Sequence, residues 1–276
     1  MSLQDKAMLI TLSVSCWTAR KQDKKVSAEV EAAHNAKNAG RFNKDLISKE
    51  YLEKLTSHAS AIRSYHYKMT LPWMDNGARL LPSKLFQEYS AEMRKMKQEY
   101  ATLVSNFAQT YPTLVQEARQ RLGTMFDPAD YPEASELYGK FDVELDIMPV
   151  PDGADFRVAV SDAERASIAQ DISERVAKRQ AAAIRSAWVR VREAVTRVAT
   201  CLSQPKARIF DSLTENLEEL VKVLPGLNIN EDPDMDRVCD RIAHGLIVDP
   251  DRLRKSAMLR SKVCAEAQAI LELCPA

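Results

Sequence analysis

Residues 161 to 203 read SDAERASIAQDISERVAKRQAAAIRSAWVRVREAVTRVATCLS and contain neither glycine nor proline. Ser161 followed by Glu164 is a capping box, in which two side chains satisfy backbone groups of the first helical turn. Apolar residues then recur at helical spacing as far as Leu202. We expect one amphipathic helix roughly 64 Å long. It exceeds the ~48 Å diameter of a compact globule of this chain length, which predicts an elongated molecule.

A second apolar pattern runs from Ser83 to Leu122. Its large side chains alternate three and four positions apart, as in the seam of a coiled coil: Phe86, Tyr89, Met93, Met96, Tyr100, Leu103 and Phe107. Pro112 lacks a backbone donor and is expected to kink or divide this helix, and Gly123 is expected to end it. The two long amphipathic helices are expected to pack against each other as an antiparallel pair.

Two segments alternate apolar and polar residues, which is typical of half-buried strands. The first, residues 9 to 17, places four apolar side chains on one face: Ile10, Leu12, Val14 and Cys16. The second, residues 141 to 148, is predicted to form a β-hairpin with residues 156 to 160. A lone hairpin is marginally stable, so we expect residues 9 to 17 to pair with it in one small antiparallel sheet.

The first third of the chain contains three further segments. Residues 20 to 45 are charged and hold few large apolar groups, which predicts an exposed arm or loose helix. Apolar residues at helical spacing predict a helix from about residue 44 to residue 65. Residues 65 to 82 are predicted to be an aromatic loop without a regular element, because one glycine and two prolines interrupt them.

Three shorter helices are expected near the C-terminus, at residues 205 to 224, 233 to 244 and 250 to 273. Each has a proline near its first turn, where the missing backbone donor has no cost. Asp232 and Asp249 precede the last two and are expected to be their N-caps.

These elements predict a mainly α fold with a small antiparallel β-sheet, of the α+β class. We expect residues 1 to 203 to contain the strands, the hairpin and the two long helices, and residues 204 to 276 to form a helical region that packs on them. The chain has 276 residues, of which 45% are hydrophobic, and this is enough for a substantial core.

Charge and cysteine content restrict the protein's environment. Lys plus Arg and Asp plus Glu both number 39, so no global charge attracts the chain to nucleic acid or to an anionic membrane. The five cysteines include no CxxC pair, which favours reduced thiols. No segment approaches the length of apolar sequence that spans a bilayer. We therefore expect a cytoplasmic protein without a membrane partner.

The sequence offers little for catalysis or metal binding. The four histidines form neither an HExxH motif nor a pair four positions apart, and no nucleophile elbow, phosphate-binding loop or dinucleotide fingerprint is present. The acidic cluster between Asn230 and Arg237 lacks the glycine and the distal glutamate of a calcium-binding loop, and acids at a helix start suit the helix dipole. We expect no enzymatic activity, no metal and no cofactor.

A basic cluster occupies the second half of the long helix. It has one acid, Glu193, and seven cations: Arg175, Lys178, Arg179, Arg185, Arg190, Arg192 and Arg197. One interpretation is a solvated face whose charges meet acids of the next predicted helix, namely Glu215, Glu218 and Glu219. The others are a ridge that follows nucleic-acid phosphates and a surface that docks an acidic protein partner.

The length of this helix also bears on self-association. If its end extends beyond a compact globule, apolar residues of its stripe are exposed unless other chains cover them. Trp188 and Val195 are the candidate contacts between copies. Most soluble oligomers are closed and symmetric, so a homo-oligomer of that kind is expected.

Three stretches of the chain resemble an uncharacterised family of bacteriophage and prophage proteins. They are an N-terminal strand with a tryptophan near its end, here Trp17, then TLPWMDNGARLLP at residues 70 to 82, then FDVELDIMPVP at residues 141 to 151. The glycine, alanine and arginine of the family's central loop are here Gly77, Ala78 and Arg79. No functional residue transfers from this resemblance, which covers residues 8 to about 203.

The resemblance implies a phage-encoded protein in the bacterial host cytoplasm. Members of that family are often encoded near MoxR-like AAA+ ATPases and von Willebrand A-type proteins, which implies such a protein as a partner. The leading hypothesis is a non-enzymatic, homo-oligomeric assembly or accessory protein that acts through protein contacts. The alternative is a nucleic-acid-binding protein that uses the basic helix face at residues 175 to 197.

Overall fold

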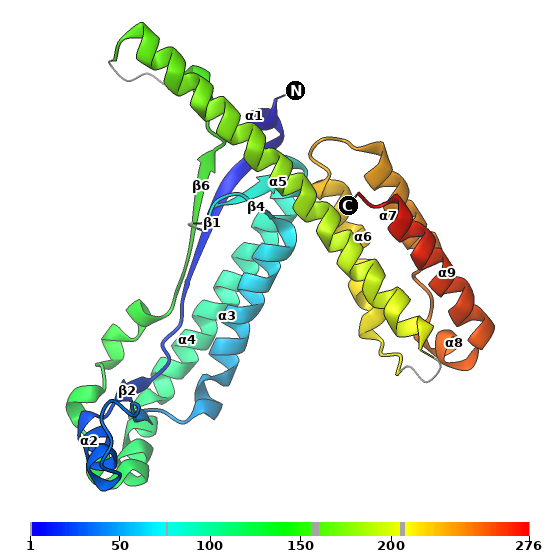
Figure 1. Cartoon of the computed structure of the whole chain (residues 1–276). Helices are drawn as coiled ribbons and strands as arrows, with labels where there is room; N and C mark the ends of the chain where they lie inside the picture. Colours follow the sequence, from blue (N-terminus) through cyan, green and yellow to red (C-terminus); the bar gives the residue numbers. More distant parts are fainter. Residues whose placement is uncertain (1, 76, 156–159, 205–207, 276) are drawn as a thin grey trace. The chain divides into compact units, whose positions relative to one another are not determined.

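The computed structural model of the chain describes residues 2–75, 77–155, 160–204 and 208–275 (Figure 1). Helices dominate, and the strands form a four-stranded and a two-stranded sheet, which confirms the expected mainly α fold with a small antiparallel sheet. Contacts divide the chain into two compact units. Unit 1 contains Met1–Thr11, His66–Tyr89 and Asp146–Ala276, and unit 2 contains Leu12–Tyr65 and Ser90–Leu145. Residues on both sides of the expected boundary at 203/204 belong to unit 1.

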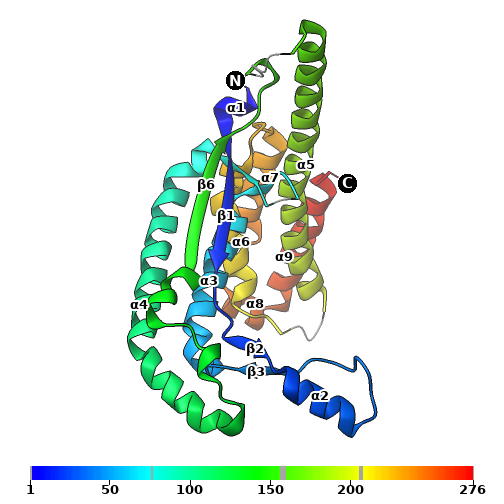
Figure 2. The same ribbon diagram turned by 90° about the vertical axis from the view of Figure 1, so that its left-hand side faces the viewer.

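The larger sheet has the order β4, β5, β1, β6, with bounds Leu71–Pro72, Arg79–Pro82, Ala7–Ser15 and Asp142–Pro149. β1 and β5 are antiparallel, with Ala7 opposite Pro82 and Ile10 opposite Arg79. Figure 2 shows β6 beside β1 and running in the opposite direction. The expected pairing of the first strand with the segment at 141 to 148 is therefore confirmed. Of the second predicted hairpin strand, residues 156–159 lie outside the described part of the chain.

The loop expected at residues 65 to 82 is wrong, because this segment supplies a helix end and two strands. Helix α3, Lys49–Met69, continues four residues past the predicted end. Pro72 and Pro82 are the last residues of β4 and β5, and a proline is tolerated at such positions. Gly77 lies between these strands with a φ of 96°, a left-handed conformation that glycine adopts without strain.

Of the expected kink or division at Pro112, the division is absent: helix α4, Phe86–Leu122, remains one helix, and Figure 2 shows it curved. Its seam, which was expected to face the other long helix, contacts α3 and the strand ends within unit 2. The Tyr100 ring stacks on His58 of α3 at 6.0 Å, and its hydroxyl donates to the Ser15 carbonyl at 2.9 Å. Phe107 packs edge-on against Phe141, with ring centroids 5.7 Å apart.

Short elements complete unit 2. The predicted exposed arm contains β2 (Arg20–Gln22), α2 (Lys24–Ala33) and β3 (Asn43–Asp45), with β2 and β3 paired antiparallel. The Asp23 carboxylate caps α2, which has no buried residue. Between α4 and β6 the chain forms the 3₁₀ helices η2 to η5, at Gly123–Met125, Pro128–Asp130, Ala134–Glu136 and Tyr138–Lys140.

Unit 1 is built around α5, Asp162–Ser203, which begins at the predicted capping box: Ser161 and Glu164 bind each other's backbone N–H groups. Its other elements are α1 (Leu3–Lys6), η1 (Ser83–Leu85), η6 (Gly153–Asp155), α6 (Ser212–Leu227), α7 (Pro233–Gly245), α8 (Pro250–Lys255) and α9 (Ala257–Leu273). Figure 2 shows α5 beside α9, and α6 also contacts α5. The N-caps expected at Asp232 and Asp249 are confirmed.

Two helix ends near the C-terminus differ from expectation. α6 continues through Pro225 as far as Leu227. Pro225 leaves the Val221 carbonyl without its helical donor, and the Cys239 thiol approaches that carbonyl at 3.7 Å. The single helix expected at 250 to 273 is divided at Ser256, whose hydroxyl accepts from the Leu259 backbone and caps α9.

Candidate functional site

The basic cluster of α5 is largely exposed. Arg179 and Arg190 are half-buried, whereas the other five cations are exposed: Arg175, Lys178, Arg185, Arg192 and Arg197. Over the described ranges, none of the seven forms an ion pair. Glu219, one of the acids expected to meet them, pairs with Lys68 at 3.0 Å. The interpretation of a face neutralised by the next helix is therefore not supported, and six cations are left for other contacts.

Arg190 differs from the other six cations because its guanidinium hydrogen-bonds to backbone carbonyls of its own chain. Its guanidinium donates to the carbonyls of Tyr67 and Lys68, both at 3.0 Å, and of Thr70 at 2.5 Å. These carbonyls lie at the end of α3, where the last helical turn has no donors of its own. Burial, together with the nearby charge of Arg79, lowers the pKa of Arg190 to about 10. These bonds hold it within its own chain, so it is less available to a partner than the other six cations.

Replacing Arg190 by methionine is expected to lower the free energy of unfolding of unit 1 by about 2 kcal/mol, because it removes the donors to three carbonyls, two of them part-buried. Amide hydrogen exchange of α5 peptides measures this change. Arg192→Met, two residues along the helix and exposed, is the matched control and should change it by less than ~0.5 kcal/mol. Equal stabilities of the two variants would contradict the role assigned to Arg190.

A buried polar cluster continues from Arg190. The Arg79 Nε donates to the Thr70 hydroxyl at 2.6 Å, and its guanidinium lies 4.7 Å from the centre of the Tyr67 ring. The His66 Nδ1 is 2.8 Å from the Tyr89 hydroxyl. His66 is only 2% exposed; burial, with the Arg79 charge, lowers its pKa to about 4. This histidine is therefore neutral at pH 7. The cluster joins α3, β5 and α5.

The exposure expected at Trp188 and Val195 is wrong. Both are buried, and so are the other core-facing residues of this part of α5: Ala183, Ala187, Val191, Val198, Ala199 and Leu202. α6 and α9 of the same unit pack along this part of the helix. The C-terminal half of α5 is therefore a core element of unit 1, and Trp188 and Val195 face their own chain.

The first half of α5 has the opposite character. From residue 162 to residue 182 no side chain is buried, although Ile168, Ile172 and Val176 form an apolar stripe at helical spacing. These three side chains are half-exposed. Beside the stripe, the helix begins with an excess of acids and continues with the basic cluster. This exposed half, residues 162 to 182, is the candidate interaction surface.

Other kinds of site find little support. Among the described residues, no group of three or more His, Cys, Asp or Glu side chains is placed to hold a metal ion. No helix in that part of the chain is long and apolar enough to cross a membrane. No protein-family model, curated protein or solved structure matches the chain. The resemblance to the bacteriophage family thus stays a prediction, and the functional argument rests on the surface itself.

Proposed function

We propose that the protein is a non-enzymatic assembly protein that associates with copies of itself through the exposed half of α5. The observation that carries this proposal is the apolar stripe of Ile168, Ile172 and Val176 on a helical segment without any buried side chain. Helices gain most of their stability by packing an apolar face against another element. A second copy supplies that element.

The charges along α5 favour an antiparallel pair of copies. An acidic block of Asp162, Glu164, Asp171 and Glu174, which includes one cation, Arg165, paired with Asp162, precedes a basic block of Arg175, Lys178 and Arg185. When two α5 helices lie antiparallel with their stripes in contact, the acidic block of each faces the basic block of the other. Such a two-fold interface is self-complementary, as closed oligomers require. Attraction between opposite charges then adds to burial of the stripe.

Ile172→Asp is expected to convert the assembly into a 31 kDa monomer at micromolar concentration, because it places a charge at the centre of the apolar contact. Ile172 is half-exposed, so the fold of unit 1 should persist. The matched control is Ser173→Asp, which adds the same charge at the next, exposed position and should leave the mass unchanged. Native mass spectrometry measures both. A wild-type chain that is itself monomeric would overturn the proposal.

A charge exchange tests the antiparallel arrangement. Arg175→Glu with Lys178→Glu reverses part of the basic block, and Asp171→Lys with Glu174→Lys reverses part of the acidic block. Each pair alone should weaken association, because like charges then face each other. All four substitutions together should restore it. Association that stays weak in the fourfold variant would contradict the antiparallel pairing.

Nucleic-acid binding is the second candidate function, favoured by the six cations that have no acidic partner in the described structure. DNA affinity that falls steeply with salt would support it. The pair Asp171→Lys with Glu174→Lys separates the two functions, since like-charge repulsion should weaken self-association while the added cations should strengthen DNA binding. Trp188, the one aromatic residue of α5, is buried, so this helix presents no ring for base stacking. We therefore place self-association first.

The wider setting follows from the family resemblance. We propose that the protein is phage-encoded and acts in the cytoplasm of the bacterial host. An AAA+ ATPase or a von Willebrand A-type protein is the expected further partner, and the assembled form is the state that it would engage. Co-purification of such a protein with the wild-type chain, and its loss with Ile172→Asp, would support this order of events.

A further inference from the structure

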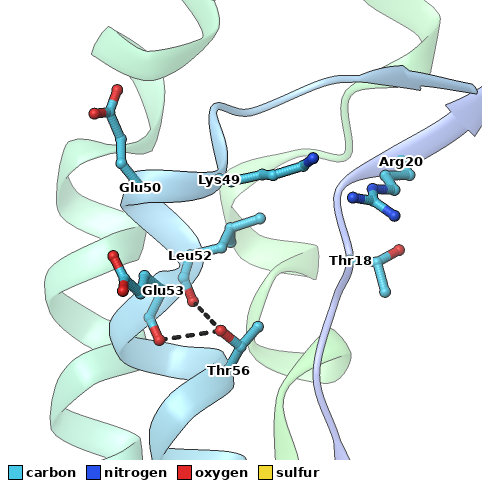
Figure 3. A pocket seen from close by; sticks show the side chains of 7 residues that line it. All are labelled: Thr18, Arg20, Lys49, Glu50, Leu52, Glu53 and Thr56. Carbon is cyan, nitrogen blue, oxygen red and sulfur yellow. Dashed lines mark hydrogen bonds between the residues drawn. The ribbon is translucent and has the colours of Figure 1, made fainter.

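A pocket of about 490 Å³ lies in unit 2, between the chain entering β2 and the first two turns of α3 (Figure 3). This volume is within the usual range for small-molecule sites. Arg20 and Lys49 line the side nearest β2, and Leu52 projects between them and the rest of α3. The pocket lies in a different unit from the α5 surface.

The charged side chains of the pocket are separated onto different sides. The Arg20 Nε donates to the Asp45 carboxylate at 2.9 Å, and the Lys49 ammonium is 3.8 Å from the other oxygen of the same carboxylate. One acid thus serves two cations. Figure 3 shows the Glu50 and Glu53 carboxylates pointing away from both. The lining residues thus include two cations and two acids, and with Asp45 no net positive charge remains; the two cations are nevertheless gathered on the side nearest β2, where an incoming carboxylate can contact them.

The remaining walls are mostly apolar. Thr56 donates its hydroxyl to the carbonyls of Leu52 and Glu53, both at 3.0 Å, so its methyl group is left for the pocket. Figure 3 shows the Leu52 side chain directed toward the pocket, although it is only 5% exposed. The Thr18 hydroxyl has no hydrogen bond within the described structure and is a free polar group at the edge of the pocket.

We infer that this pocket binds a small organic carboxylate whose body is apolar. The carboxylate would lie between Arg20 and Lys49, where charge-assisted hydrogen bonds are available. The apolar body would lie on Leu52 and the Thr56 methyl group. Because the lining holds as many acids as cations, a monocarboxylate is favoured over a multiply charged phosphate.

The test uses the full chain and octanoate, a carboxylate with a short alkyl body, in isothermal titration calorimetry. Lys49→Gln is expected to weaken octanoate binding about tenfold. The Lys49 side chain is 71% exposed, so this variant should fold normally. Lys54→Gln is the matched control, an exposed lysine of the same helix outside the pocket, and should bind like the wild type.

Two further ligands test the charged and the apolar contacts of octanoate separately. Octanol lacks the charge, acetate lacks the alkyl body, and each should bind at least about tenfold more weakly than octanoate. The inference is overturned if octanoate does not bind at millimolar concentration, if octanol binds equally well, or if Lys49→Gln leaves the affinity unchanged. Ile172→Asp should not alter octanoate affinity, because the pocket and the α5 surface are independent proposals.

Discussion

Replacing Lys44 by methionine is expected to lower the free energy of unfolding of unit 2 by about 4 kcal/mol. Lys44 lies in the charged arm, yet its side chain is only 7% exposed. Its ammonium is 2.7 Å from the Asp130 carboxylate and donates to the Met125 carbonyl at 2.6 Å. Asp23, which caps α2, lies 3.7 Å away on another side. This one cation thus joins the arm to the segment that follows α4.

The large loss of stability expected for Lys44→Met comes from the Asp130 carboxylate, which would stay buried without its main ion-pair partner. The Asp130 side chain is 5% exposed, and burial alone would raise its pKa. Hydrogen bonds from Lys21 and Lys44 outweigh burial and hold the pKa of Asp130 below its ordinary value. Without Lys44, a buried carboxylate would keep only the exposed Lys21, at 2.5 Å. Breaking one side of a buried ion pair costs more than the pair itself contributes.

Amide hydrogen exchange of α4 peptides measures the stability of unit 2. Lys54→Met is the control, an exposed lysine in the same unit, and should cost less than ~0.5 kcal/mol. The double variant Lys44→Met with Asp130→Leu removes both charges, and we expect it to recover more than half of the loss. A double variant no more stable than Lys44→Met would show that packing, and not the unpaired carboxylate, causes the effect.

Acidification from pH 7 to pH 4 is expected to cost unit 1 about 3 kcal/mol through His66 alone. Unfolded histidine has a pKa of about 6.5. In the folded protein, burial and the Arg79 charge lower the pKa of His66 to about 4. Between these values the unfolded chain binds the proton and the folded chain does not. Stability therefore falls as the pH decreases through this window.

An NMR titration of the His66 ring measures its pKa directly, and a value near 6.5 would contradict the prediction. His66→Gln supplies the thermodynamic control, because glutamine cannot titrate and can still hydrogen-bond to the Tyr89 hydroxyl. The variant should lose less stability than the wild type between pH 7 and pH 4. The difference between the two slopes isolates His66 from the carboxylates, which also titrate there.

Capping side chains in the sequence predict three helix starts, whereas α6 begins at Ser212 and not near Pro205, where its start was expected. Ser161 with Glu164, Asp232 and Asp249 each act within a few residues, and each caps a helix as expected. β1 is predicted for a similar reason, because its apolar and polar residues alternate within one short stretch of sequence. These features depend on neighbours in the chain, so a sequence contains what is needed to predict them.

Features that depend on distant partners are the ones that sequence reasoning misses. β4 has two residues, and β5 pairs with β1 only because the fold brings them together. Lys44 stands in a charged run that reads as solvent-exposed, and its burial depends on Asp130, far along the chain. Arg190 reads as one cation among seven, because helical periodicity shows its face but not the helix end beside it.

The same distinction holds for the candidate site: local spacing predicts its residues, but their burial depends on distant elements. Spacing identified the α5 cations, and six remain available on the surface. Trp188 and Val195 were expected to be exposed because α5 is longer than a compact sphere of this chain length. They are buried because α6 and α9 pack against this part of α5. The apolar residues nearer the start of α5 belong to the same stripe, and they differ in that η6 contacts this half, at Ala169, and buries none of its side chains.

In the proposed assembly, the division of α5 into a buried half and a half without buried side chains would let folding precede association. Trp188, Val191 and Val195 are enclosed by helices that follow on the same chain. A newly made chain can therefore close the core of unit 1 before it meets another copy. In the proposed assembly only the first half of α5 contacts another copy, so subunits would exchange without unfolding.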